Sequence, residues 1–340
     1  MTIEIIVGLP HLNRGPILDR VVRLRQPALI SANCLSRWSN RAGSREWTGW
    51  RTGHLANARL LPSLHLDSAG FVATSLYGAF PWTIAQYVAL AASYPFGWWA
   101  SADYCVEAEI ASDRSQVIER LSRTIAANRE CRRYADDHGN VSTMMPVIQG
   151  RCPSDYERCV DGLWGMIERA PLLGVGSMCR RDILGPEGLI AVVEHLDHIL
   201  PQGIHLHLFG VKGTALPYLL PFGKRIRSID SQAYGTSARR EALKHGLSKS
   251  DLFVADHLER WLIAQTGRLR QRPRTLPVTA QQEGDPDPAD PWEAAIVAAR
   301  REIQALIEQG DLDHDGIIEP WVQTWAADIY QDQGCEAVAR

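Results

Sequence analysis

The chain has 340 residues, of which 45% are hydrophobic and 22% are charged, a composition typical of a globular protein and not of a disordered one. Its formal net charge of −3 excludes a uniformly basic nucleic-acid-binding protein, so any nucleic-acid surface must be local. The sequence shows no secretory signal pattern and no apolar run of membrane-spanning length. We therefore expect a cytoplasmic protein, of a bacterium or of a virus-infected host cell, that does not contact a membrane.

The seven cysteines form no C-x-x-C pair. Their odd number and irregular spacing indicate a reducing compartment and not a disulfide framework. Structural zinc sites need closely paired ligands, so we expect no bound metal, and no sequence pattern indicates a cofactor.

Short apolar runs bounded by Gly, Pro, Asn or Asp alternate along the chain with segments of helical period. The predicted strands are 3–8, 28–33, 63–67, 98–104, 144–149, 172–178, 204–210 and 226–231. The predicted helices between them include 83–93, 112–137, 154–170, 186–200 and 214–222. This alternation predicts an α/β protein with a (β/α)8 TIM barrel. An open doubly wound sheet is the alternative, but no G-x-G-x-x-G opens a helix after the first strand.

The pattern changes after Ser231. We predict a catalytic barrel over 1–235 and a helical C-terminal extension over 236–340. Within the extension, 236–265 is expected to be helical, 284–291 is a Pro/Asp-rich linker, and 292–309 is an amphipathic helix. The buried positions expected in the first of these segments are Leu243, Leu247, Leu252, Val254, Leu258 and Leu262. Residues 311–319 resemble the start of a calcium-binding loop, but Val322 replaces the glutamate of its last position; a helix–turn–helix with aspartate caps is the other interpretation.

Two aspartates, Asp67 and Asp230, stand at the ends of predicted strands. Parallel strands of a barrel converge at their carboxyl ends, so both side chains are expected on one face. A nucleophilic carboxylate and a second acid/base carboxylate are what the cleavage and re-formation of a glycosidic bond require. The alternative is structural: Asp67 would cap a turn, and Asp230 would pair with Arg225 or Arg227.

Five segments resemble motifs of the tRNA-guanine transglycosylases, in the same order over about residues 1–235. Residues 67–71, Asp-Ser-Ala-Gly-Phe, resemble the Asp-Ser-Gly-Gly-aromatic motif of that family. The others are Val147-Ile148-Gln149-Gly150, Gly174-Val175-Gly176-Ser177, Leu208-Phe209-Gly210-Val211 and Ile229-Asp230-Ser231. Each motif alone is weak, but five in register on a chain that reads independently as a barrel are specific.

The sequence departs from the tRNA enzymes in ways that favour a DNA-modifying branch. Ala69 replaces the second glycine of the first motif, and the zinc subdomain is absent. The segments 31–34, 103–107 and 176–181 are more similar to the DpdA-type transglycosylases. That resemblance implies exchange of guanine in DNA for a 7-deazaguanine such as preQ0, with possible partner proteins. The alternatives are a transglycosylase that acts on tRNA, and a non-catalytic barrel that binds a deazapurine or a partner.

The resemblance also implies roles for single residues. Asp230 would attack C1′ of the sugar, and Asp67 would transfer protons to and from the bases. Asp103 would accept from N1–H and the 2-amino group of guanine, and Gln149 and the Gly176 backbone would bind its carbonyl oxygen. Phe71 and Met178 would sandwich the ring. The remaining residues expected at the base are Ser68, Gly150, Ser177, Phe209 and Gly210.

A local basic excess follows the predicted nucleophile. Between Lys212 and Arg274 there are thirteen Lys or Arg and five Asp or Glu residues, which suits phosphate neutralisation. The predicted nucleic-acid contacts are Arg180, Arg181, Arg268, Arg270, Arg272 and Arg274; a solvated face is the alternative for each. His205 and His207 share one face of their strand, and we expect hydrogen-bonded barrel residues and not a metal pair.

Overall fold

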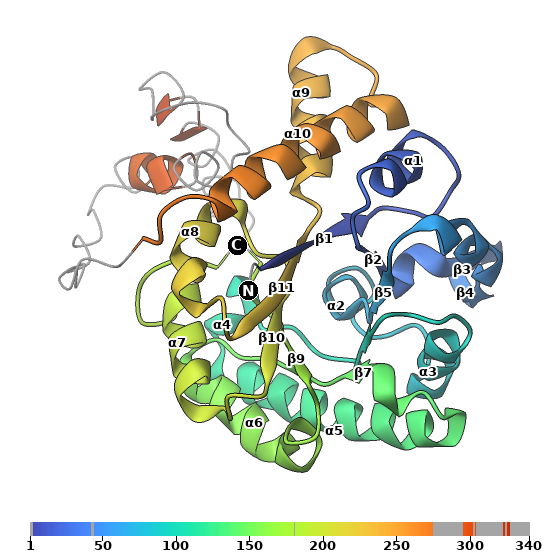
Figure 1. The fold of residues 1–340 in the computed structure, drawn as a ribbon, viewed down its shortest axis with the longest axis vertical. Coiled ribbons are helices and arrows are strands. Elements are labelled where there is room, and N and C mark those ends of the chain that lie inside the picture. The colour runs from blue at the N-terminus through green and yellow to red at the C-terminus, as the bar shows by residue number, and fades with distance from the viewer. Residues whose placement is uncertain are drawn as a thin grey trace, which may run out of the picture.

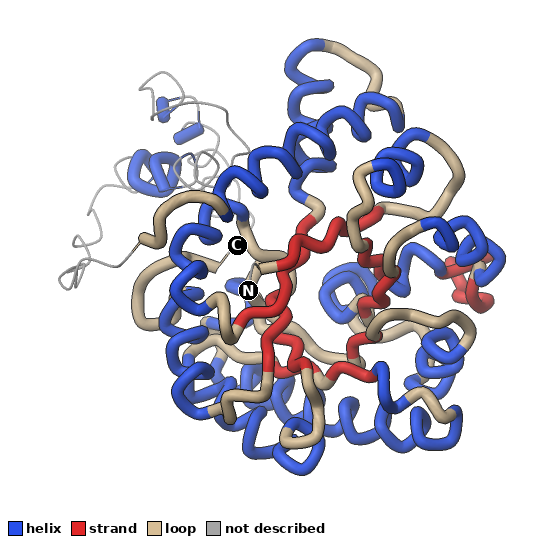
Figure 2. The backbone as a smooth tube through the Cα atoms, in the orientation of Figure 1, coloured by secondary structure: helices blue, strands red, loops and turns tan. Residues whose placement is uncertain are grey.

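The computed structural model describes residues 3–41, 44–179, 181–274, 295–301, 303, 322, 323, 325 and 326. Parallel strands form a nearly closed barrel in the centre of the molecule, and helices surround it (Figures 1 and 2). The protein is therefore an α/β barrel, as the alternation of strands and helices predicts. The parallel strands are β1 (Glu4–Leu9), β2 (Ala28–Ser31), β5 (Leu64–Asp67), β6 (Trp99–Ala100), β7 (Met144–Met145), β8 (Val147–Ile148), β9 (Leu172–Val175), β10 (His205–Leu208) and β11 (Ile226–Ser231).

Pro146 explains why nine strands fill eight positions in the barrel. The order around the sheet is β7-β6-β5-β2-β1-β11-β10-β9-β8. β7 pairs with β6 on one side and β8 pairs with β9 on the other, and only Pro146 separates the two short strands. Proline has no N–H to donate to a neighbouring strand, so a single strand position is divided in two. Each of the eight predicted strand segments overlaps one position of the barrel.

The helices follow the strands in chain order. They are α1 (Pro16–Arg23), α2 (Gly70–Tyr77), α3 (Ile84–Ala92), α4 (Ala108–Ala111), α5 (Arg114–His138), α6 (Pro153–Ile167), α7 (Leu189–Ile199), α8 (Leu216–Leu219), α9 (Ala233–His245) and α10 (Asp251–Leu269). Short 3-10 helices cover Ala32–Leu35, Thr52–Leu60, Val141–Thr143, Gly213–Ala215 and Leu220–Phe222. The helix expected over 214–222 is thus three short turns.

The segment 236–265 is a pair of helices and not one. Gly246 adopts a left-handed backbone (φ +62°) that ends α9, and the Ser250 hydroxyl accepts a hydrogen bond from the Phe253 N–H at the start of α10. Because the break changes which face of the segment meets the barrel, the expected burial is only half right. Val254, Leu258 and Leu262 are buried, whereas Leu243, Leu247 and Leu252 are exposed. α10 packs against α1, α8 and α9 (Figure 1).

A hairpin inserted between β2 and β5 is absent from the predicted elements. β3 (Ser36–Arg41) and β4 (Ser44–Trp50) pair antiparallel, with Trp38 opposite Trp47. Trp47 in turn meets Trp82 with ring centroids 6.1 Å apart. The hairpin escaped prediction because its strands lack a continuous apolar run; cross-strand and tertiary aromatic contacts stabilise it instead.

Three apolar clusters hold the barrel together. One packs β1, β2 and β5 against α1, α3 and α10, and a second packs β8 to β11 against α5, α6 and α7. The third fills the barrel itself with Ile6, Leu29, Trp98, Ala100, Met145 and Val147.

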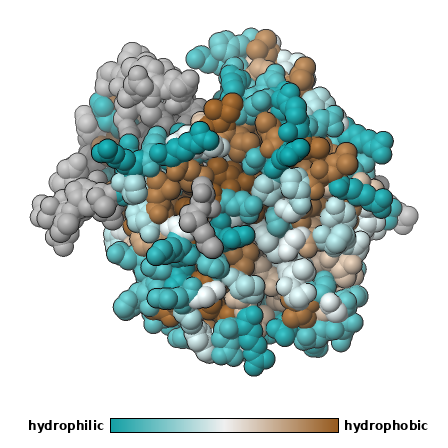
Figure 3. Space-filling view, viewed as in Figure 1, coloured by the Kyte–Doolittle hydropathy of each residue, from teal (hydrophilic) through white to brown (hydrophobic). Residues whose placement is uncertain are grey.

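Figure 3 shows hydrophobic surface near the middle of the face that it presents, with hydrophilic surface around much of its edge.

The C-terminal expectations fall largely outside the described residues. Helical residues 295–301 lie within the expected helix 292–309, and Ala295, Ala299 and Ile303 form a small apolar cluster with Val322 and Ala326. The linker 284–291 and the loop 311–319 lie wholly outside the described part of the chain.

Candidate active site

A cavity of about 900 Å³ opens where the parallel strands end at their carboxyl termini. Asp67 at the end of β5 and Asp230 near the end of β11 both line it. The barrel thus brings the two predicted catalytic carboxyl groups into one cavity. Other predicted residues on its wall are Phe71, Asp103, Gln149, Gly176, Ser177, Phe209 and Gly210.

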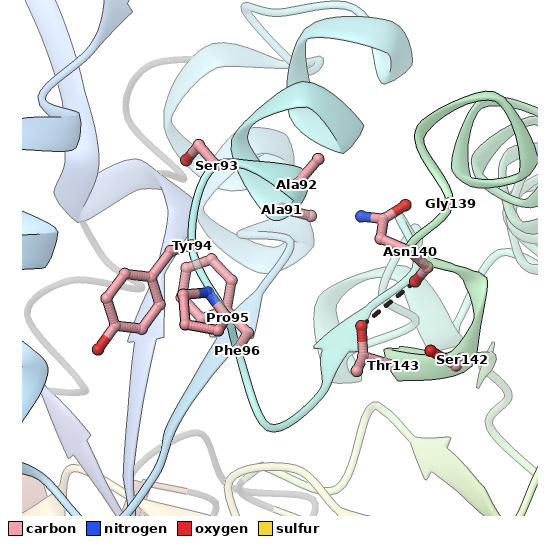
Figure 4. Close-up of a pocket in the computed structure, with 10 residues that line it drawn as sticks. All are labelled: Ala91, Ala92, Ser93, Tyr94, Pro95, Phe96, Gly139, Asn140, Ser142 and Thr143. Atoms are coloured by element: carbon pink, nitrogen blue, oxygen red, sulfur yellow. Dashed lines mark hydrogen bonds between the residues drawn. The ribbon is translucent and has the colours of Figure 1, made fainter.

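A smaller hollow of about 410 Å³ lies at the other end of the barrel, between segments that precede β6 and β7 (Figure 4). Tyr94, Phe96 and Asn140 are among the residues that line it, and the Thr143 hydroxyl donates to the Asn140 carbonyl oxygen across 3.2 Å. Among the described residues that line it, none has a carboxylate, imidazole, thiol or cationic side chain. The larger cavity is therefore the candidate active site.

Asp230 is held by one of its two carboxyl oxygens. The N–H of Gly210 donates to Oδ1 across 3.0 Å, and Nε2 of His207 lies 3.3 Å from the same atom. Gly210 has φ +66°, a left-handed conformation that glycine adopts without strain. The side chain is 13% exposed, so the carboxyl group is largely shielded from water yet faces the cavity.

Asp67 has an environment that suits proton transfer. Burial, followed by the charge of Asp103, raises its pKa from 3.8 to about 7; Asp230 also raises this pKa, and the Ala69 N–H lowers it by donating to Oδ2 across 3.0 Å. A carboxyl group with a pKa near 7 is present in both protonation states at neutral pH. It can therefore give a proton and take one back.

Asp103 anchors a hydrogen-bond network on the floor of the cavity. Its Oδ1 accepts from the Ser68 hydroxyl across 2.6 Å, and its Oδ2 accepts from Nε2 of Gln149. The Ser177 hydroxyl donates to Oε1 of Gln149 across 2.5 Å and accepts from the Val106 N–H across 2.7 Å. Burial raises the pKa of Asp103, and its two donors oppose that rise.

Two glycines let these side chains approach the backbone closely. A Cβ on Gly70 would lie 2.5 Å from the Asp103 carbonyl oxygen, and one on Gly176 would lie 2.1 Å from Nε2 of Gln149. Real Cβ atoms essentially never come that close. The glycines at these two motif positions therefore serve the geometry of Asp103 and Gln149.

A model of the protein family described as DpdA, DeoxyPurine in DNA protein A, matches residues 42–281. The match spans more than half of the chain. The chain belongs to the DpdA family. A search of curated proteins finds no match.

The match to DpdA runs from the β3–β4 hairpin past the end of α10. It therefore contains both catalytic candidates, the Asp103 network and the basic segment that ends at Arg274. The strands β1 and β2, which precede the matched range, complete the barrel.

Three residues predicted to touch the base lie elsewhere in this DpdA-family barrel. Met178 is fully buried in the cluster between the barrel and its outer helices, so it cannot stack on a base in the cavity. Ser68 is also fully buried; its hydroxyl donates to Asp103 and accepts from the Gly70 N–H across 3.3 Å. Gly150 packs against the start of α6, where a Cβ would lie 2.8 Å from the Tyr156 ring.

The Gly176 backbone is also used within the protein. Its N–H donates to the Ile148 carbonyl oxygen across 3.0 Å, and its own carbonyl accepts from the Tyr156 hydroxyl across 2.8 Å. The N–H expected to bind a guanine carbonyl oxygen is thus occupied by the sheet.

Phe71 is 42% exposed and lines the cavity at the start of α2.

Arg181 does not suit the phosphate contact predicted for it. It is 2% exposed, and its guanidinium donates to Tyr156 Oη and to the carbonyl oxygens of Ser177, Arg151, Glu187 and Gly150. These five acceptors match the five N–H groups of arginine, so Arg181 fastens the loops after β8 and β9 together. Arg180 lies outside the described residues.

The arginines at and beyond the end of α10 lie apart from the cavity wall. Arg268 is half-buried, and burial lowers its pKa; it donates to Oε1 of Gln265 across 2.8 Å. Arg270, Arg272 and Arg274 are exposed. Among the described residues, the cavity wall includes none of these four arginines.

Sequence reasoning missed other cations that do line the cavity. They are Lys212 after β10, Arg239 and Arg240 on α9, and Lys249 before α10. The basic excess between 212 and 274 contains all four, but the sequence did not show which of its members face the site. Helix α9, which starts two residues after β11, carries two of them to the cavity.

Neither a metal site nor a membrane-spanning helix is found among the described residues. Within them, no group of three or more His, Cys, Asp or Glu side chains is arranged to hold a metal ion. No helix in this part of the chain is long and apolar enough to cross a membrane.

Proposed function

We propose that the protein is a base-exchange transglycosylase that replaces guanine in DNA by a 7-deazaguanine such as preQ0. The observation that carries the proposal is the convergence of Asp67, Asp103 and Asp230 on one cavity of a DpdA-family barrel. Each of the three has a distinct environment, and each environment suits one part of the reaction.

Asp230 is the nucleophile of the proposed reaction. Because Gly210 and His207 engage Oδ1, Oδ2 is the oxygen that attacks C1′ of the deoxyribose. The C1′–N9 bond breaks and a covalent glycosyl ester with Asp230 forms. Guanine leaves with both bonding electrons and takes a proton at its nitrogen from Asp67.

The second half of the reaction reverses these steps with the new base. Asp67, now ionised, accepts the N9 proton of the incoming 7-deazaguanine. N9 attacks C1′, and the ester bond to Asp230 breaks and returns the free carboxylate. The pKa of Asp67, raised by burial and by Asp103 to about 7, matches an acid that must act in both directions near neutral pH.

Asp103 and Gln149 read the base. Each carboxylate oxygen of Asp103 keeps a lone pair after accepting from Ser68 or Gln149, so the group can also accept from N1–H and the 2-amino group of guanine. Gln149 has a second N–H on Nε2 that suits the purine carbonyl oxygen. Phe71 supplies an apolar face at the mouth of the cavity.

The polymer is held by cations on one side of the cavity. Lys212, Arg239, Arg240 and Lys249 come from consecutive segments after β10 and β11, and phosphate neutralisation is the main source of affinity for nucleic acid. Arg270, Arg272 and Arg274 extend this basic region beyond the cavity.

The test is to express the chain in cells that make 7-deazaguanines, then digest DNA and tRNA separately to nucleosides for mass spectrometry. The proposal predicts a 7-deazaguanine deoxynucleoside that is absent with the Asp230→Asn variant. A modified nucleoside in tRNA alone would indicate that the protein acts on tRNA and not on DNA. No modified nucleoside in either pool would indicate a non-catalytic barrel.

A further inference from the structure

His207 lies inside the barrel directly beneath the carboxyl group of Asp230. It is fully buried, on β10, next to the strand that carries Asp230. Its ring is packed between Trp98, with centroids 4.7 Å apart, and Phe209, with centroids 4.5 Å apart. An apolar cluster fills this part of the barrel, so a buried polar imidazole here needs polar partners.

The two ring nitrogens of His207 face two residues of β11. Nδ1 lies 2.9 Å from the Ser228 hydroxyl, and Nε2 lies 3.3 Å from Oδ1 of Asp230. With the Ser228 hydroxyl donating to Nδ1, the proton of the neutral ring resides on Nε2 and points toward the carboxylate. The opposite tautomer would place a nitrogen lone pair against an oxygen lone pair.

The contact between Nε2 and Oδ1 is close but not yet aligned as a hydrogen bond. Hydrogen bonds of this kind are often long or poorly aligned until the reacting complex forms, when they tighten. Since the Gly210 N–H already donates to Oδ1, a rotation of the carboxyl group about its bond to Cβ is the motion that aligns the second donor.

We propose that His207 is a positioning residue for Asp230. Its Nε2–H and the Gly210 N–H hold Oδ1 as a pair of donors, so that Oδ2 is directed at C1′ of the sugar. Ser228 fixes the tautomer that makes this possible. The inference rests on the proposed nucleophilic role of Asp230, and it assigns to β10 the task of orienting that nucleophile.

A packing role for His207 makes the opposite prediction about substitutions. If the ring only fills the barrel, the apolar His207→Leu variant is tolerated better than the polar His207→Gln. If the ring donates to Asp230, His207→Gln is the better substitute, because its amide Nε2–H can replace the imidazole donor. The order of the two variants therefore separates the two roles.

The kinetic experiment measures formation of the covalent glycosyl-enzyme in a single turnover on guanine-containing duplex DNA. We expect His207→Leu to lower this rate by about 10²–10³-fold, the usual loss when one preorganised donor is removed. KM for DNA should change little. His207→Gln should recover most of the rate, and Ser228→Ala should fall between. A His207→Leu rate equal to wild type, or above that of His207→Gln, overturns the inference.

Crystal structures of the same variants test the inference without any activity. The carboxyl group of Asp230 should keep its orientation in His207→Gln and rotate away in His207→Leu. If the wild-type protein exchanges no base but this rotation is seen, the proposed function fails, and what stands is that His207 orients the carboxyl group of Asp230. If the wild type is active and the orientation is unchanged in His207→Leu, the positioning role fails alone. Should His207→Leu not fold, Ser228→Ala and His207→Gln still decide the outcome.

Discussion

Asp67 ends β5, Asp103 lies three residues after the neighbouring strand β6, and the charge of Asp103 acts on Asp67. Burial is the larger cause, and Asp103 the second, of the rise in the pKa of Asp67 to about 7. β5 and β6 pair directly, with Leu66 opposite Trp99, so the two carboxyl groups are neighbours by construction of the barrel. The residue that we propose reads the base thus also raises the pKa of the residue that we propose carries the proton.

The raised pKa of Asp67 predicts a stability change with pH. Because the folded-state pKa is above the unfolded value of 3.8, folding favours the protonated carboxyl, and this contribution is lost as pH rises from about 4 through 7. Asp67→Asn keeps the shape without the charge. Between pH 5 and pH 8 we expect its free energy of unfolding, measured in urea, to gain on the order of 2 kcal/mol relative to wild type. A constant difference between the two proteins across that range would contradict the raised pKa.

Gly70 and Ala69 give a matched pair of substitutions. A Cβ on Gly70 would lie 2.5 Å from the Asp103 carbonyl oxygen, so Gly70→Ala must displace Asp103 and should abolish binding of the free base, measured by calorimetry. Ala69 adopts φ +69°, a conformation that glycine tolerates better. We therefore expect Ala69→Gly to bind the base as wild type does, with unchanged or higher stability. Equal binding by both variants would mean that Asp103 does not read the base.

The barrel was predictable from the sequence because short apolar runs bounded by turn-forming residues alternate with segments that have the apolar periodicity of a helix. The helix pair α9–α10 and the hairpin β3–β4 were less visible. Gly246 and Ser250 break one helical pattern into two, a local signal that the apolar period obscured. The hairpin depends on tryptophan contacts with Trp82, more than thirty positions away, and no short-range pattern encodes those.

Arg181 should behave as a structural residue. Arg181→Lys supplies three donors where five carbonyl and hydroxyl acceptors now bind a planar guanidinium. We expect a loss of about 3 kcal/mol in the free energy of unfolding, because several buried acceptors lose their donor. The control is Arg270→Lys, an exposed position at the end of α10, which should change stability by less than about 0.5 kcal/mol. Equal denaturant midpoints for the two variants would restore the nucleic-acid interpretation of Arg181.

The two groups of cations should differ in their effect on DNA. Replacing Lys212, Arg239, Arg240 and Lys249 by serine should weaken duplex binding and also slow the single-turnover exchange rate, because these residues line the cavity. Replacing Arg270, Arg272 and Arg274 should weaken binding alone. In both cases the slope of log affinity against log salt should flatten by about 0.9 for each phosphate that the variant no longer neutralises. Unchanged affinity in either variant would make that group a solvated face.

The sequence did not show which of the predicted site residues point their side chains into the cavity. The carboxyl ends of parallel barrel strands converge on one face. Four residues at or just after such ends therefore line the cavity: Asp67, Asp103, Gln149 and Asp230. Met178 and Arg181 follow β9 on a turn whose Ser177 has φ +54°, and this turn directs them into the protein. The motif residues were recognisable in the sequence. The direction in which the side chains of Met178 and Arg181 point follows from the left-handed backbone of Ser177.

The most direct measurement is the detection of a covalent complex between the protein and guanine-containing duplex DNA. The complex is resolved on a denaturing gel, and the modified residue is mapped by mass spectrometry. We predict an adduct on Asp230 that is chased away by added 7-deazaguanine, is absent in Asp230→Asn, and accumulates more slowly in Asp67→Asn. An adduct on another residue, or base exchange by Asp230→Asn at the wild-type rate, would contradict the assignment of Asp230 as the nucleophile.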